Sequence, residues 1–308
     1  MSVYTQVDHE RLTDLLQHYG FTLEHAEAAP LGIENSTFLL QAHDDHGGEK
    51  QLVLTIFEQF DEQALLPYLG LLNELASAGL PVPAALTDRQ GQRLQQIQGK
   101  PTVLVPRLPG RHCFSPDVNH CRQIGALLAR LHHQPPELAD DLISERERLD
   151  DFAAHLGRLT GDDYHHANQV LDEWNEVPSG DTLIHGDLFR DNALFDDHGR
   201  LTGVLDFYNA CLDCPEYDLA VALNDWTVAA DGRPVPKREA SLLAGYRDAG
   251  GQWDETLLPL ALAVAALRFW LSRLAGPVGE HAAGLGSKDP TEFARIFGYR
   301  HSALGGKH

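Results

Sequence analysis

The sequence is poor in positive charge. Its 24 Lys and Arg residues are outnumbered by 45 Asp and Glu residues, which gives a formal net charge of −21 at pH 7. A surface with this balance repels a phosphate backbone, so nucleic acid is not expected as a partner. A small anionic ligand could still bind where backbone N–H groups, a few cations and a divalent metal ion outweigh the global field.

The sequence also lacks a targeting segment and a long hydrophobic run. Residues 1–10 contain neither a basic stretch nor an apolar one, so we expect a cytoplasmic protein. The most apolar stretch, 257–267, is interrupted by Pro259 and followed by Arg268, which makes it too short to cross a membrane. This stretch predicts a buried helix, and no membrane partner is expected.

Cysteine is scarce as well, with 4 residues in the chain. Cys211 and Cys214 form a C-x-x-C pair, but no second pair and no His ligand at zinc spacing accompanies it. We therefore interpret the cysteines as small buried hydrophobic residues and not as metal or redox groups.

The rest of the composition is typical of a globular protein, with 43% hydrophobic and 22% charged residues. The first part of the chain favours strands, which are predicted at 36–41, 51–57, 91–97 and 101–105. A polar turn, 43–50, joins the first two strands into a hairpin, and helical spacing of leucines predicts a helix over 63–77. The stretch 106–110, with two prolines, is typical of a hinge between lobes.

The second part of the chain is mainly helical. Apolar spacing predicts helices over 120–133, 145–159, 164–174, 216–226, 238–248 and 255–274. A β-rich insertion, 182–207, interrupts this helical part. We therefore predict an α+β fold with a small, mostly antiparallel β lobe over 1–107 and a larger helical lobe over 108–308.

The β-rich insertion carries polar residues that suit phosphoryl transfer. Its two apolar runs, joined by the turn 196–199, predict a hairpin that sets Asn192 across from Asp206. An amide oxygen and a carboxylate are hard ligands that suit Mg²⁺. Asp187, five residues before Asn192, can orient a hydroxyl group and accept its proton. The spacing H-x-D-x-x-x-x-N followed by D-F matches the catalytic loop and metal-binding Asp of kinases.

Two alternatives for this insertion are weighed against that interpretation. Asp187, Asp191, Asp196 and Asp197 could be solvated turn residues, as Asp often is, but the complete pattern disfavours this. His185 has no evident role as a base or ligand, and we predict that it makes a structural hydrogen bond.

The first lobe should supply a cover for the phosphates, and the loop 32–37 fits this task. Thr55 occupies the strand position where kinases usually have a phosphate-pairing Lys. Either another cation, Lys50 or Arg107, serves the phosphates, or Mg²⁺ and backbone donors suffice. The candidate ATP-binding residues are Gly32, Asn35, Ser36, Thr55, Val105 and Arg107.

The blocks H-G-D-L-F-R-D-N and L-D-F-Y resemble the aminoglycoside phosphotransferase and choline kinase superfamily. A narrower resemblance, to homoserine kinases of this fold, covers most of the chain through G-I-E-N-S-T-F, L-T-I-F-E, Y-D-L-A-V-A-L-N-D-W and A-L-R-F-W-L-S-R-L. In that group Thr55 is the expected residue. The resemblance implies a protein-kinase-like two-lobed fold and ATP-dependent phosphorylation of the homoserine hydroxyl, with Asp187 catalytic and Asn192 and Asp206 on Mg²⁺.

An amino-acid acceptor presents a carboxylate and an ammonium group, which call for an Arg and a carboxylate in the pocket. Arg268 and Arg273 are candidates for the first contact, and Asp225 and Tyr208 for the second. The alternative is that the arginines pair with structural acids such as Asp218. We expect the enzyme to act on small molecules as a monomer or homodimer.

Three other functions are considered. A kinase for choline, hydroxylysine or an aminoglycoside would share the fold, and its cationic substrate would need an acidic or aromatic pocket. A nucleotide-binding regulator without turnover is suggested only by the missing Lys, and the intact Asp187, Asn192 and Asp206 argue against it. A metallohydrolase using His185 and Asp187 would lack further His ligands at usable spacing.

Overall fold

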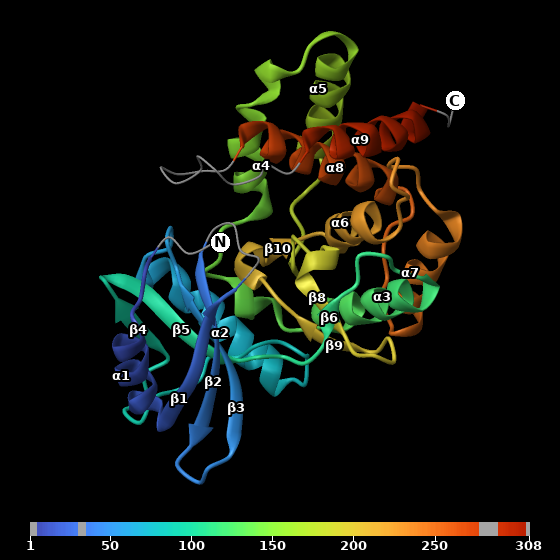
Figure 1. Ribbon diagram of the computed structural model, residues 1–308. Helices are drawn as coiled ribbons and strands as arrows, with labels where there is room; N and C mark the ends of the chain where they lie inside the picture. Colours follow the sequence, from blue (N-terminus) through green and yellow to red (C-terminus); the bar gives the residue numbers. More distant parts are fainter. Residues whose placement is uncertain (1–4, 30–34, 277–288, 306–308) are drawn as a thin grey trace. The chain divides into compact units, whose positions relative to one another are not determined.

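The computed structural model describes residues 5–29, 35–276 and 289–305, and the chain divides into two compact units, Met1–Pro109 and Gly110–His308 (Figure 1). The sequence predicts a boundary between residues 107 and 108, and the roles it assigns to the two parts stay predictions. The first unit contains α1 His9–Tyr19, β1 Phe21–Ala28, β2 Ser36–Asp44, β3 Glu49–Ile56, α2 Glu62–Ser77, β4 Leu94–Ile97 and β5 Lys100–Pro106.

The first unit is built on a five-stranded antiparallel sheet with the order β1-β2-β3-β5-β4. Along β3, Leu54 and Ile56 are buried and Thr55 between them is half-buried, so the two apolar residues share one face. Leu12 and Leu16 of α1 belong to the same apolar cluster as these residues. The predicted hairpin is confirmed, with Ser36 of β2 opposite Ile56 of β3.

Two elements of this unit, α1 and β1, are missing from the sequence-based prediction. The signals for α1 are present, because the Asp8 side chain accepts from the Arg11 N–H at its start and Gly20 ends it with a φ of 81°. The predicted helix over 63–77 is confirmed as α2. β4 begins later than predicted because Asp88 accepts from the N–H groups of Gln90 and Gln92 and holds the preceding residues in a turn.

The second unit is mainly helical. Its elements are β6 Arg111–His112, α3 Val118–His132, α4 Glu145–Ala153, α5 Gly161–Asn175, β7 Thr182–Ile184, β8 Ala193–Phe195, β9 Leu201–Val204, β10 Cys211–Asp213, α6 Pro215–Trp226, α7 Pro236–Asp248, α8 Leu258–Ala275 and α9 Pro290–Gly305. The strands form two small sheets, β10-β7 and β6-β8-β9. The predicted helices are confirmed except that α4 stops at Ala153. A separate 3₁₀ turn follows, and its Gly157 disfavours a continuous α-helix.

The core of the second unit surrounds α8, which packs against α6 and α9 (Figure 1). Within the described residues, α8 is the one helix that is long and apolar enough to cross a membrane, but 61% of it is buried inside the protein. Its Trp270 ring lies 5.6 Å from that of Phe297 in α9, a helix that the sequence analysis did not predict. The predicted buried helix and the α+β class are therefore confirmed.

Candidate active site

The loop that carries Asp187 follows β7 and is shaped by its backbone contacts. Gly186 has a φ of 74°, and a Cβ atom there would lie 2.7 Å from the Asn209 carbonyl oxygen, so only glycine fits. The N–H groups of His185 and Gly186 donate to the two carboxylate oxygens of Asp218 at 2.8 and 2.9 Å. The backbone is thus fixed immediately before Asp187.

Asn192 contacts Asp187 directly. Its Nδ2 donates to the Asp187 carbonyl oxygen at 2.8 Å and to Oδ2 of the Asp187 carboxylate at 3.2 Å. Because the nitrogen end of the amide faces Asp187, the amide oxygen of Asn192 lies on the other side of the group. The Asn192 side chain can therefore support Asp187 and offer an oxygen ligand at the same time.

The β8–β9 hairpin brings Asp206 to the same end as Asn192, as the sequence predicts. Ala193 pairs with Val204, and the Leu205 N–H donates to the Asn192 carbonyl oxygen at 2.9 Å. Asp206 follows Leu205 and is exposed, with φ 62° and ψ 59°. A non-glycine residue in this left-handed region costs about 1–2 kcal/mol, so the surrounding contacts must hold it there.

His185 links the Asp187 loop to the Asp206 turn. Its Nε2 lies 2.9 Å from the Leu205 carbonyl oxygen, its Nδ1 lies 3.3 Å from the Asp187 N–H nitrogen, and its ring packs on Phe207. A carbonyl only accepts and an N–H only donates, so we assign a neutral ring with its proton on Nε2. Burial lowers the pKa of His185 against the opposing effect of Asp218, and the predicted structural role is confirmed.

Asp218 of α6 is fully buried beneath the loop and also lies 3.1 Å from His132 Nε2. Burial alone would raise its pKa, but the contacts from His132 and the His185 N–H hold the pKa of Asp218 below its usual value. Sequence reasoning considered Asp218 only as a partner for arginines. The available signal was an acidic residue directly before the apolar run 219–223 of this helix.

The oxygen donors at this end of the hairpin fit a divalent cation. The Asn192 amide oxygen and the Asp206 carboxylate are hard ligands. Across the described ranges, no group of three or more His, Cys, Asp or Glu side chains is arranged to hold a metal ion. An ion bound here would take water and phosphate oxygens as its other ligands, which is the usual arrangement for Mg²⁺ bound with a nucleotide.

The C-x-x-C pair is not a metal or redox group. Cys211 and Cys214 are buried free thiols, and burial raises the pKa of Cys214 to about 12 and that of Cys211 further. Thiols in this state stay protonated and behave as hydrophobic side chains.

Arg268, predicted to bind substrate, is 5% exposed. Its Nε donates to Glu145 at 3.2 Å and its Nη2 to the Asn209 amide oxygen at 3.4 Å. Burial alone would lower the pKa of Arg268, but the nearby charges of Glu145 and Asp187 raise it. Arg268 therefore lies within electrostatic range of Asp187, and it also has a structural partner.

Asp225 and Arg273 have partners of their own. Arg190, in the loop after Asp187, donates to the two Asp225 oxygens from Nε at 3.0 Å and from Nη2 at 2.9 Å. Arg273 donates to Glu292 at 2.6 Å. Asp225 therefore fixes Arg190 in the catalytic loop, while Arg273 ties α8 to α9.

Tyr208 lies two residues after Asp206 and is half-buried. Burial and the neighbouring Asp206 carboxylate both raise its pKa, so its hydroxyl stays protonated at neutral pH. It is the predicted substrate residue that is nearest in sequence to the hairpin end.

The predicted ATP-binding residues belong to the first unit, and Gly32 lies outside the described residues. The Asn35 side-chain oxygen accepts from the Glu58 N–H at 3.3 Å, and the buried Ser36 hydroxyl lies 2.6 Å from a Glu58 carboxylate oxygen. Ser36 faces the α1 side of the sheet with Ile56, whereas the next position along β3, Thr55, faces the opposite side.

Val105 shares the face of Thr55, because it pairs with Val53 of β3. Arg107 is exposed and follows β5, where its N–H donates to the Gln51 carbonyl oxygen at 2.9 Å. The sheet thus brings Thr55 and Val105 to one face and turns Ser36 to the other.

Lys50 and Arg107, the cations proposed in place of the missing lysine, lie at the end of the sheet that carries the β2–β3 turn. Lys50 pairs with Asp44 at 3.0 Å beside this turn, and Arg107 lies at the same end of the strands. Lys100, which sequence reasoning did not consider, pairs with Glu58 at the opposite end, next to Ser36. The position of Lys100 depends on how β5 pairs with β3, which the sequence pattern did not reveal.

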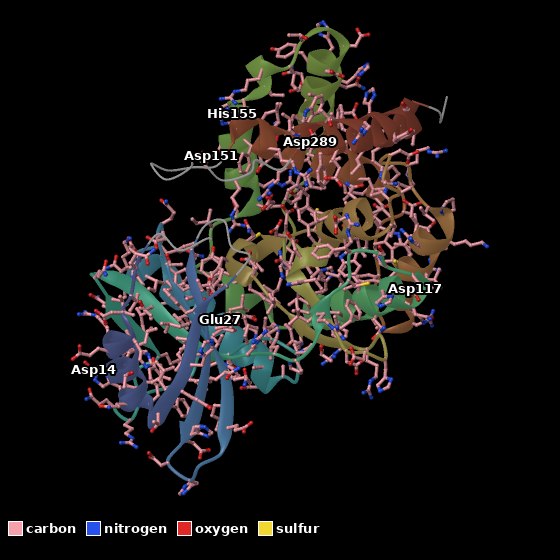
Figure 2. All side chains as sticks on the ribbon, in the orientation of Figure 1. Asp14, Glu27, Asp117, Asp151, His155 and Asp289 are labelled. Carbon is pink, nitrogen blue, oxygen red and sulfur yellow. The ribbon has the colours of Figure 1, made fainter. Side chains whose placement is uncertain are left out.

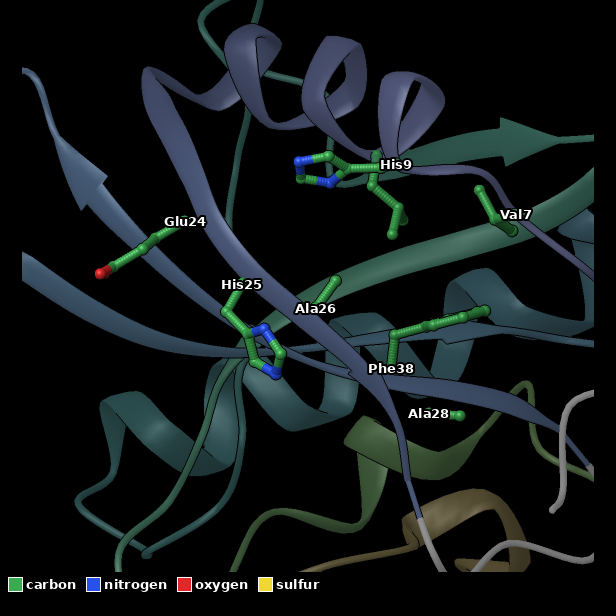
Figure 3. Close-up of a pocket in the computed structure, with 8 residues that line it drawn as sticks. Val7, His9, Glu24, His25, Ala26, Ala28 and Phe38 are labelled. Carbon is green, nitrogen blue, oxygen red and sulfur yellow. The ribbon is translucent and has the colours of Figure 1, made fainter.

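A hollow of about 340 Å³ in the first unit lies where α1 begins (Figure 3). Residues of α1, β1 and β2 line it together with a residue just before α1, and they are Val7, His9, Leu12, Glu24, His25, Ala26, Ala28 and Phe38. None of the described residues predicted for the site lines it.

The negative charge of the chain is spread over its surface. Figure 2 marks exposed acids on several elements, among them Asp14 of α1, Glu27 of β1 and Asp151 of α4. An anionic nucleotide must therefore be held by local donors.

Comparison with known proteins identifies the family. Residues 25–254 match the model of the phosphotransferase enzyme family. The homoserine kinase of Pseudomonas aeruginosa (strain UCBPP-PA14) is 36% identical over 95% of this chain and 94% of its own length. The homoserine kinase of Cupriavidus necator is 35% identical over 96% of this chain and 95% of its own length.

Among solved structures, amicoumacin kinase in complex with AMP-PNP and Ca²⁺ has a TM-score of 0.68 at 15% identity, covering 98% of this chain and 94% of that chain. This likeness confirms the predicted two-lobed kinase-like fold. The chain therefore belongs to the phosphotransferase enzyme family, alongside homoserine kinases that match it over nearly its whole length.

Proposed function

We propose that this phosphotransferase transfers the γ-phosphate of ATP to the side-chain hydroxyl of L-homoserine, giving O-phospho-L-homoserine. The observation that carries the proposal is the contact between Asn192 and the Asp187 carboxylate at the hairpin end that also bears Asp206. The similarity to homoserine kinases over 95% of the chain supports the choice of acceptor. We further propose that the enzyme works in the cytoplasm.

In this proposal Asp187 orients the acceptor hydroxyl and accepts its proton as the new oxygen–phosphorus bond forms and the bond from the γ-phosphorus to the leaving ADP breaks. Asn192 holds the carboxylate of Asp187 through the 3.2 Å contact, and neutral His185 keeps the loop backbone in place. Positioning of this kind, together with electrostatic stabilisation, supplies most of the rate enhancement in phosphoryl transfer.

Asn192 and Asp206 are proposed to hold Mg²⁺ through their oxygens. The bound ion would neutralise charge on the phosphates of ATP. In the first unit, Gly32, Asn35, Ser36, Thr55, Val105 and Arg107 stay the proposed ATP-binding residues.

For the acceptor, we propose Arg268 and Tyr208 as the principal contacts, because the first lies within electrostatic range of Asp187 and the second adjoins the Asp206 turn. Arg273 and Asp225 stay weaker candidates, since Glu292 and Arg190 already account for their charges.

A coupled assay of ADP release tests the proposal with homoserine, serine, choline, hydroxylysine and an aminoglycoside as acceptors. Homoserine should give the highest kcat/KM. A higher kcat/KM for choline or the aminoglycoside would contradict the proposal and favour another kinase of the same fold.

A further inference from the structure

A group of charged and polar side chains lies beside the catalytic loop, and we call it the Glu145 cluster. Its members are Glu145, Arg148, Asn209, Tyr217 and Arg268. Glu145 is 1% exposed, and its Oε1 lies 2.7 Å from the Tyr217 hydroxyl and 3.2 Å from Arg268 Nε. Its Oε2 lies 3.4 Å from Arg148 Nη1. A single buried carboxylate therefore holds two guanidinium groups.

The Glu145 cluster reaches the catalytic loop through Asn209. Arg148 Nη1 donates to the Asn209 carbonyl oxygen, and Arg268 Nη2 donates to the Asn209 side chain. The same carbonyl oxygen lies so close to Gly186 that a Cβ there would be 2.7 Å away. Gly186 directly precedes Asp187, so Asn209 and Gly186 connect both guanidiniums to the loop of the proposed base.

The chemistry of the acceptor suits this position. Homoserine carries its carboxylate a short carbon chain away from the hydroxyl that Asp187 would deprotonate, so the group that binds the carboxylate must lie near Asp187. A guanidinium is the side chain that best matches a carboxylate, because its planar N–H fork donates two parallel hydrogen bonds.

We propose that Arg148 binds the α-carboxylate of the amino-acid acceptor, and that Glu145 is a positioning residue that holds Arg148 and Arg268 side by side. This inference rests on the proposed function. Arg148 lies on α4, far in sequence from the catalytic motif, and its side chain is 14% exposed, whereas that of Arg268 is 7% exposed. Of the two, Arg148 is the more accessible to a substrate.

Arg146 offers a matched control on the same helix. Its Nε donates to Asp213 at 3.3 Å, its Nη1 donates to the Trp174 carbonyl oxygen at 2.8 Å, and its guanidinium lies 4.3 Å from the centre of a Trp174 ring. These contacts hold Arg146 on Asp213 and Trp174, which are not members of the Glu145 cluster, so its replacement should not alter recognition of the acceptor.

The experiment compares L-homoserine with L-homoserine amide, which keeps the hydroxyl and ammonium but lacks the carboxylate charge. Arg148→Lys should lower kcat/KM for homoserine by about ten- to a hundredfold, mainly through KM, because the charge stays but the fork is lost. Its kcat/KM for the amide and its KM for ATP should be unchanged. Arg146→Lys should keep the wild-type preference for homoserine over the amide.

Arg148→Gln, which also removes the charge, is measured in parallel so that the comparison does not depend on one variant folding. Thermal melting checks that both Arg148 variants are folded. A preference for homoserine that persists in the folded Arg148 variant would overturn the inference while leaving the proposed function intact. A wild-type enzyme that does not phosphorylate homoserine would instead overturn the proposed function. Glu145→Gln should weaken the preference in the same direction, as expected for a positioning residue.

Discussion

Replacing Asp218 by Asn should loosen the loop that holds Asp187. In the native protein, Asp218 Oδ1 accepts from the Gly186 N–H, and Oδ2 accepts from the His185 N–H and lies 3.1 Å from His132 Nε2. An Asn side chain replaces one of these oxygens by an NH₂ donor. Whichever way the amide is turned, its NH₂ group faces a backbone N–H that has lost its acceptor.

The magnitude follows from these contacts. A buried donor without a partner costs about 1–3 kcal/mol, and loss of the charge weakens the contacts that remain by a similar amount. Breaking a buried charged interaction from one side costs about 3–5 kcal/mol in all. We therefore expect Asp218→Asn to lower the free energy of unfolding by about 3–5 kcal/mol. We also expect it to lower kcat at least about tenfold, because Asp187 is displaced.

Urea unfolding followed by tryptophan fluorescence measures the first effect, since all 4 tryptophans (Trp174, Trp226, Trp253 and Trp270) belong to the second unit. The control is Asp197→Asn, whose carboxylate is 79% exposed in a surface pair with Arg111 and should change neither stability nor kcat. If the free energy of unfolding of Asp218→Asn were within about 1 kcal/mol of the wild-type value and its kcat were unchanged, the reasoning about the loop would be wrong.

Four further predictions test individual residues. Asp187→Asn should lower kcat by about 10²-fold or more while ATP affinity, measured by titration, stays the same, and near-normal turnover would refute its role as base. Asp206→Ala should weaken ATP binding in Mg²⁺ with little further loss in EDTA, so equal losses in both conditions would exclude a metal role. Arg268→Lys should raise the KM for homoserine about tenfold or more, whereas a lower melting temperature with unchanged KM would assign it to the Glu145 pair alone. Burial holds the pKa of His185 in the folded protein below its unfolded value of 6.5. The contribution of neutral His185 to the free energy of unfolding is therefore complete above about pH 6.5 and is lost as the pH falls toward the folded pKa. Urea titrations at pH 7.5 and 5.5 should show this loss, and His185→Asn should reduce it.

Patterns within a short stretch of sequence predicted local structure well. The β8–β9 hairpin and the helices of the second unit follow from turn residues and apolar spacing, which act on neighbours in the chain. The same signals were available for α1, with its cap Asp8 and its ending Gly20, and for α9, whose buried Phe293, Ile296 and Phe297 recur at helical spacing. Local signals for both helices are therefore present in the sequence.

Contacts between distant residues could not be predicted in this way. Arg268 and Glu145 are 123 positions apart, and Lys100 and Glu58 are 42 apart. Such pairs form only when helices or strands pack, and a buried charge then takes whichever opposite charge the packing brings within reach. The sequence could offer Arg268 as a candidate, but it could not tell which acid would hold it.

The sequence by itself determined the order and spacing of Asp187, Asn192 and Asp206, because a loop and a hairpin between them leave the backbone few alternatives. The Asn192–Asp187 contact spans five positions and needs no other part of the chain. Only the tertiary structure decided that Asp218 from α6 fixes the loop backbone and that Arg268 from α8 meets Glu145 and Arg148 of α4. Glu145 and Arg148 are neighbours on one helix, but Asp218 and Arg268 come from other helices, so the packing of the second unit must form before these two can meet their partners.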